Sequence, residues 1–180
     1  KALASSSLTG SLTGTQVALV VLPGASDDDV AAVRSTLTDA GASVVGRVTL
    51  TDNWQSTSMS QYRATLSTSL ASHLESAAKP ASADGVVGYS IVQVLTSSGS
   101  ETDLLRQILT DKSTPLMTID EDPAGKATTL VAIGARAQSA ATASSAPTSP
   151  DAWVGMAQAV GSTSGVVVGD ASSRDAMISR

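Results

Sequence analysis

The chain has no phenylalanine and no cysteine, and its aromatic residues are two tryptophans and two tyrosines among 180 residues. Without cysteine it cannot form a disulfide, use a thiolate nucleophile, or build a zinc or iron–sulfur site on thiolates. Without phenylalanine, the core has to be filled by branched aliphatic residues and alanine. Such a core is typical of a parallel sheet covered by alanine-rich helices.

Basic residues are scarce as well. Eleven lysines and arginines face 16 acidic residues, which gives a net charge of −5, and no two basic residues are adjacent. Nucleic-acid surfaces gather lysine and arginine on one face, so we expect no nucleic-acid partner. No apolar run approaches the roughly 20 residues of a membrane-spanning helix. The many serines, threonines and alanines, with few lysines, favour an exported protein.

The first half of the chain contains a strand, a helix and a second strand. Residues 17–22 are a continuous apolar run, which predicts a strand buried on both faces. A Pro-Gly pair ends it, and Ser26 followed by three aspartates, 27–29, predicts a capped helix start. Gly41 is placed to end this helix, and 44–50 is the next strand. Two strands joined by one helix predict a parallel βαβ unit.

The rest of the chain continues to alternate helices and strands. Apolar spacing predicts helices over 59–77, 84–95, 101–110 and 151–160, strands over 115–119, 128–133 and 166–168, an acidic turn over 120–125, and a further helix beginning at Ser172. For 84–95 a strand is an open alternative, because the segment is rich in β-branched residues.

This order of elements predicts an α/β fold: a Rossmann-like three-layer sandwich with a mostly parallel sheet of about five strands. We expect residues 1–14 to be a lead-in and 15–180 to form a single α/β domain. The Ser, Ala, Thr and Pro residues of 139–150 predict a flexible surface loop within that domain.

Ligands of such sheets bind beyond the carboxyl ends of the strands. The residues expected there form a possible ligand cleft: Pro23, Gly24, Ser26, Asp52, Asp120 and Asp170. A dinucleotide site needs a Gly-x-Gly-x-x-Gly turn, but the first strand is followed by one glycine and three aspartates, which repel phosphate. We therefore expect no nucleotide and no other cofactor.

No catalytic constellation stands out. His73 is the only histidine and lies beside the apolar stripe of its predicted helix, so we interpret it as structural. Asp52 and Asp170 could pair as acid and base or bind a cation, although strand-end aspartates are commonly helix caps and turn formers. We predict no catalytic residue and no metal site, and hence no enzyme.

An ordered series of short motifs resembles the mycobacterial copper transport protein MctB family of actinobacteria. The motifs are Leu12-Thr13-Gly14-x-x-Val17, Leu22-Pro23-Gly24-Ala25, Asp29-Val30 with Val33-Arg34, Ala40-Gly41-Ala42, Gly46-x-Val48-Thr49-Leu50-Thr51-Asp52, and Val166-Val167-Val168-Gly169-Asp170-Ala171. The resemblance implies a cell-envelope protein of copper homeostasis, described as an outer-membrane, channel-like component. It also implies an N-terminal membrane anchor and a coiled coil outside this chain, and with them a membrane-attached homo-oligomer on the periplasmic or outer-membrane side.

The residues themselves offer little to copper. Copper prefers thiolate, thioether or imidazole ligands gathered in one place. The four methionines, Met59, Met117, Met156 and Met177, are scattered singly. We therefore predict that the domain acts in copper homeostasis without its own copper site. Two alternatives stay open: a ligand-binding or scaffolding module that organises other envelope proteins, and a degenerate enzyme.

Overall fold

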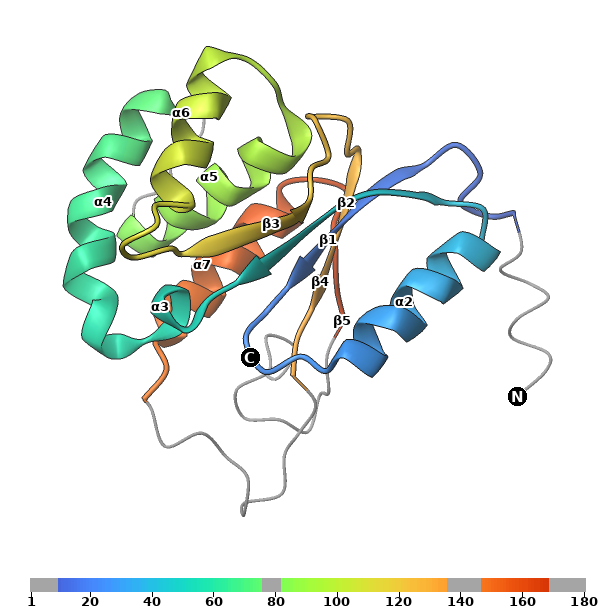
Figure 1. Cartoon of the computed structure of the whole chain (residues 1–180), viewed down its shortest axis with the longest axis horizontal. Coiled ribbons are helices and arrows are strands. Elements are labelled where there is room, and N and C mark those ends of the chain that lie inside the picture. Colours follow the sequence, from blue (N-terminus) through green and yellow to red (C-terminus); the bar gives the residue numbers. More distant parts are fainter. Residues whose placement is uncertain (1–9, 76–81, 136–146, 169–180) are drawn as a thin grey trace.

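The described part of the chain forms a sheet of five strands, and the sequence predicts about five. The computed structural model describes residues 10–75, 82–135 and 147–168. Within these ranges the sheet has the order β3-β2-β1-β4-β5 (Figure 1). The strands are β1 (Gln16–Val21), β2 (Ser43–Leu50), β3 (Met117–Glu121), β4 (Thr129–Ile133) and β5 (Val166–Val168).

Three of the four strand pairs are parallel. β1 pairs in parallel with β2 and β4, and β4 with β5, whereas β3 is antiparallel to β2. The chain returns from its helical connection to the edge where β2 ended, since Met117 pairs with Leu50 and the Thr51 amide donates to the Leu116 carbonyl over 3.0 Å. β3 therefore runs backwards. The predicted α/β class and mostly parallel sheet are confirmed, and the Rossmann-like label stays a prediction.

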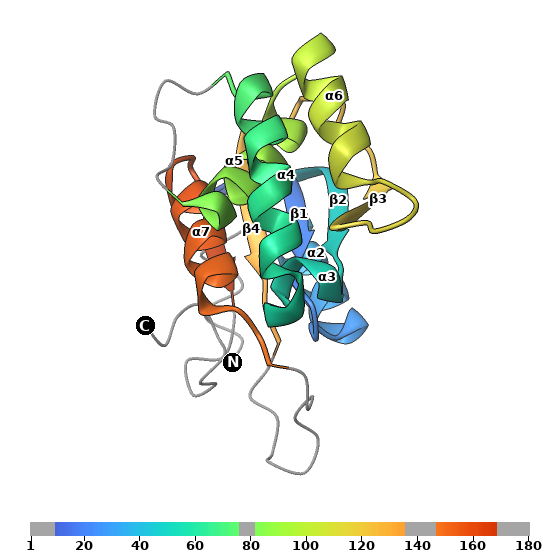
Figure 2. The ribbon, with the colours of Figure 1, turned by 90° about the vertical axis from the view of Figure 1, so that its left-hand side faces the viewer.

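The helices are distributed unevenly over the two faces of the sheet. They are α2 (Asp27–Asp39), α3 (Asp52–Gln55), the 3-10 turn η1 (Thr57–Met59), α4 (Ser60–His73), α5 (Ala83–Thr96), α6 (Ser100–Leu109) and α7 (Pro150–Gly161). Among them, α2 covers one face alone, and the others gather on the opposite face (Figures 1 and 2).

β1 separates two apolar cores. Its residues Val17, Leu19 and Val21 pack with Val30 of α2 in the smaller core. The alternate residues, with Leu22 after them, face the larger core formed with α3 to α7. All of the residues 17–22 are at most 8 % exposed, so the prediction of a strand buried on both faces is confirmed.

The segment 84–95 is a helix, which settles the alternative that its β-branched residues left open. α5 begins at Ala83, where the Ser82 hydroxyl accepts a hydrogen bond from the Gly85 amide over 3.0 Å. It packs against α4, α6 and α7. A helix surrounded in this way is apolar on all sides, which removes the stripe that would have identified it.

α4 ends earlier than predicted. The helix stops at His73, and Leu74 is extended. At the end of α4 the buried side chain of Gln93 hydrogen-bonds to the backbone. It donates to the His73 carbonyl over 3.1 Å and accepts from the Glu75 amide over 2.9 Å. These two bonds satisfy backbone groups that another helical turn would otherwise satisfy. The last two residues predicted for this helix, 76 and 77, lie outside the described ranges.

Two further predicted boundaries shift. The predicted acidic turn over 120–125 is wrong at its start, because β3 continues through Glu121. Pro150, expected in the flexible loop, is the first residue of α7. The residues before it hydrogen-bond to the end of α3 and to η1: the Ser149 amide donates to the Gln55 carbonyl, and the Thr57 amide donates to the Pro147 carbonyl. The loop residues 139–146 and the helix predicted from Ser172 lie outside the described ranges.

The crossing of α5 and α7 gives a stability prediction. A Cβ atom on Gly155 would lie 2.6 Å from the Asp84 carbonyl oxygen, so Gly155→Ala forces two backbones apart. We expect the substitution to lower the free energy of unfolding by about 1–3 kcal/mol in urea denaturation followed by circular dichroism. Gly161→Ala in the same helix is the control: no atom lies within 4 Å of its Cβ. It should be neutral or stabilise by up to about 1 kcal/mol. Equal effects of the two substitutions would contradict the close crossing.

Candidate functional site

A cleft of about 400 Å³ opens where β1 and β2 end beneath the first turn of α2. Apolar residues and charged or hydroxyl side chains line it together. The lining residues are Val21, Leu22, Pro23, Gly24, Ala25, Asp27, Val30, Arg47, Thr49, Leu50, Thr51 and Asp52. The cleft lies at the carboxyl ends of two parallel strands, where the sequence places a possible ligand site.

The structure brings most of the predicted cleft residues to this place. Pro23, Gly24 and Asp52 line the cleft. Ser26 is the N-cap of α2 beside it, and its hydroxyl accepts a hydrogen bond from the Asp29 amide over 3.2 Å. Asp170 lies outside the described residues.

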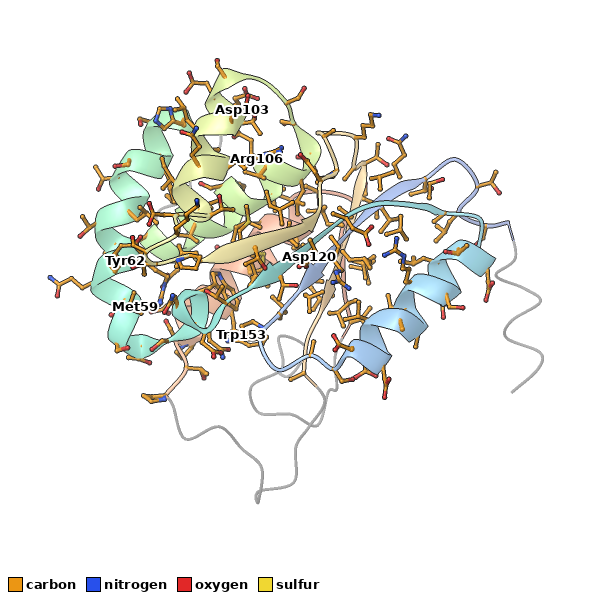
Figure 3. All side chains as sticks on the ribbon, viewed as in Figure 1. Met59, Tyr62, Asp103, Arg106, Asp120 and Trp153 are labelled. Atoms are coloured by element: carbon orange, nitrogen blue, oxygen red, sulfur yellow. The ribbon has the colours of Figure 1, made fainter. Side chains whose placement is uncertain are left out.

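Asp120 reaches the same region by a route that the sequence does not predict. It lies within β3 rather than in a turn after it (Figure 3). The register of β2 and β3 shifts between Arg47 and Val48, so that Asp120 is an extra residue opposite β2. Such a bulge re-aims side chains. The Asp120 carboxylate accepts hydrogen bonds from Thr49 Oγ1 over 2.6 Å and from Arg47 Nε over 3.2 Å. It therefore holds the side chains of two residues that line the cleft.

A second arginine–carboxylate pair joins α2 to the same sheet edge. Arg34 donates two hydrogen bonds to the Glu121 carboxylate, over 2.5 and 2.9 Å. These bonds lower the pKa of Glu121 and raise that of Arg34. Both side chains are about 40 % exposed, so water screens the pair. Together with the Asp120 contacts, this pair ties α2, β2 and β3 into one charged network beside the cleft.

A buried arginine holds the segment that carries Asp52. Arg63 is fully buried, and its Nε donates to Asp84 Oδ1 over 2.6 Å. Its Nη1 donates to the carbonyls of Asn53 and Ser56, over 3.1 and 2.7 Å. The short helix α3 is thus fixed to α4 and α5. A buried guanidinium needs such partners, because desolvation of an unpaired charge is costly.

The described donors for a soft metal lie apart from one another. Met117 and Met156 are fully buried, while Met59 is partly exposed at the start of α4 (Figure 3). His73 Nδ1 lies 2.6 Å from Glu101 Oε2. Within 10–75, 82–135 and 147–168, no three His, Cys, Asp or Glu side chains are grouped so that they could hold a metal ion. Met177 is outside these ranges.

Sequence reasoning missed Arg34, Arg47 and Thr49 as part of the site. Their partners are far away in the chain: Asp120 lies 73 positions after Arg47. The only available signal is the alternation of β2, in which Arg47 and Thr49 are the polar residues between buried Val48 and Leu50. That alternation places them together on the α2 side of the sheet.

Comparison with known proteins gives one family. The sequence model described as "Copper transport outer membrane protein, MctB" matches residues 1–179. None of the curated proteins matches the chain. In the described part of the chain, every helix is too short or too polar to cross a membrane.

The Arg34–Glu121 pair predicts a pH dependence of stability. Because Arg34 lowers the pKa of Glu121 in the folded protein, the pair stabilises the fold above the ordinary glutamate value of 4.5. That stabilisation is lost as the pH falls through the lowered value. Glu121→Gln should therefore reduce the free energy of unfolding at pH 7 by up to about 1 kcal/mol, and the difference from wild type should vanish at acid pH. Urea denaturation across pH 3 to 7 measures it.

Glu75→Gln is the matched control, since Glu75 is exposed and has no ion pair among the described residues. Its difference from wild type should stay near zero at every pH. A Glu121→Gln difference that is the same at pH 3 and pH 7 would contradict the assignment.

Proposed function

The chain belongs to the MctB family of copper transport outer membrane proteins, and we propose that it acts in copper transport and homeostasis as an exported cell-envelope domain without its own copper site. The observation that carries the proposal is the family match, which spans residues 1–179 and so includes every described helix and strand. Family membership implies the copper role and the outer-membrane association. The export of this domain and its lack of copper ligation are the parts that we propose.

The placement of the soft donors supports the second part. Copper binding with high affinity needs several thioether, thiolate or imidazole groups within a few ångström. Met117 and Met156 are buried in the larger core, and the imidazole of His73 is hydrogen-bonded to Glu101. Among the described residues, Met59 is left as a single partly exposed thioether.

We further propose how the domain is attached and assembled. The resemblance to the family suggests a membrane anchor and a coiled coil outside this chain, through which the domain would form a homo-oligomer and meet other envelope proteins. The scarcity of positive charge argues against nucleic acid as a partner. We propose no catalytic activity.

One observation favours a second function, that of a ligand-binding or scaffolding module. The cleft is lined by apolar residues together with a few charged side chains, and small-molecule sites combine these two kinds of group. This function is compatible with the first, because a binding module can serve a transport assembly.

Copper titration tests the absence of a copper site. Isothermal calorimetry with Cu(II), and competition against a chromogenic chelator for Cu(I), should show no site with a dissociation constant below about 1 μM. Met59→Leu and His73→Gln should leave the weak titration curve unchanged. Stoichiometric sub-micromolar binding that either substitution abolishes would overturn the proposal.

The copper role itself is tested in cells. Deletion of the gene should change the copper content of cells grown in added copper, and the wild-type gene should restore it. A Met59→Leu/His73→Gln gene should restore it equally well, because neither side chain is proposed to bind copper. An unchanged copper content after deletion would contradict the role, and failure of the double variant alone would contradict the absence of copper ligation.

A further inference from the structure

Arg47 is anchored on one side and open on the other. The Asp120 carboxylate accepts a hydrogen bond from Arg47 Nε, and Thr49 Oγ1 donates a hydrogen bond to the same carboxylate oxygen. Within the described residues, no hydrogen bond engages the two terminal nitrogens of Arg47, which is a lining residue of the cleft. Its side chain is only 34 % exposed. A guanidinium held at Nε keeps its outer edge available for a carboxylate, which it can bind through two parallel hydrogen bonds.

The other charged groups of the cleft are carboxylates. Asp27 lies in the first turn of α2, and Asp52 in the first turn of α3, so they approach the cleft from two elements. Neither forms an ion pair within the described residues. A phosphate or other dianion would be repelled by both, and a simple cation would leave the outer edge of Arg47 without a partner.

The size and floor of the cleft narrow the ligand class further. At about 400 Å³ the cleft lies near the lower end of the range for small-molecule sites. Val21 and Val30 of the smaller core, with Ala25 packed against it, give it an apolar floor. A ligand that satisfies all of these groups is small, carries one negative and one positive charge, and has an aliphatic part.

We propose that this cleft binds a free aliphatic α-amino acid, with its carboxylate on Arg47, its ammonium group near Asp27 and Asp52, and its side chain on the apolar floor. The proposal is independent of the copper role, because no metal takes part in it. Asp120 acts as a positioning residue, since it fixes the orientation of Arg47 and would not touch the ligand.

Nuclear magnetic resonance of the whole 180-residue chain tests the proposal. Titration of the ¹⁵N-labelled protein with L-leucine up to about 10 mM should give saturable amide shifts confined to residues 21–30 and 47–52. Arg47→Gln should weaken leucine binding by about tenfold or more. Arg106→Gln is the matched control, because Arg106 also pairs with one aspartate, Asp122, but on α6 and outside the cleft. It should bind leucine as the wild type does.

Two analogues separate the charges of the ligand. Leucinamide lacks the carboxylate and 4-methylpentanoate lacks the ammonium group, and each should bind about tenfold more weakly than leucine. The proposal is overturned if no saturable shifts appear, if Arg47→Gln binds leucine like the wild type, or if either analogue matches leucine.

Should Arg47→Gln fail to fold, Asp52→Asn decides the question, because Asp52 is exposed and its removal leaves the sheet intact. The proposal expects Asp52→Asn to weaken leucine binding but not 4-methylpentanoate binding. The opposite pattern, or no change in either, would overturn it.

Discussion

The burial of β1 on both faces is the constraint on which the rest of the fold depends. The strand has a paired neighbour on each side, and no residue from Val17 to Leu22 is more than 8 % exposed. A strand without a polar face has to be covered by helices above and below. α2 supplies the cover on one side and the α3–α7 group on the other. In the described part of the sheet, polar side chains consequently lie at strand ends and on β2 and β3.

The antiparallel edge strand decides which of those polar groups meet. Had β3 run parallel to β2, its acidic end would have lain at the carboxyl edge with Asp52, and the rim would have been more negative. Its reversed direction and its bulge instead bring Asp120 and Glu121 to the two arginines. Each of these two carboxylates forms an ion pair with one arginine there. The carboxylates left at the cleft belong to the first turns of α2 and α3, where the helix dipole favours negative charge.

Elements that form through interactions between residues close in the sequence could be predicted, and features that depend on distant residues could not. β1 and α2 were predictable in full, because an apolar run, a serine cap and a terminal glycine are local signals. α5 was ambiguous, because a helix enclosed by three others has no polar stripe. The early end of α4 depends on Gln93, about 20 residues away. No local pattern contains such a contact.

The same reasoning applies to the candidate site. Pro23, Gly24, Ser26 and Asp52 could be placed because each follows or caps a locally recognisable element. The direction of β3 and the pairing of Arg47 with Asp120 could not, because they depend on the path of the chain through the described helices α3 to α6 between β2 and β3. The burial of Arg63 was likewise hidden, since an arginine among serines and threonines reads as a surface residue.

The absence of phenylalanine bears on the copper question. A core built of valine, leucine and alanine lacks large adaptable side chains, and methionine fills irregular gaps through its three rotatable bonds. Met117 and Met156 are both fully buried in the larger core. Their thioethers pack against the apolar residues of this core, and ligation of copper would require the core around them to open. A contribution of this domain to copper transport therefore has to come through contacts other than thioether ligation by its buried methionines, which directs attention to the cleft and to the surfaces that face the rest of an assembly.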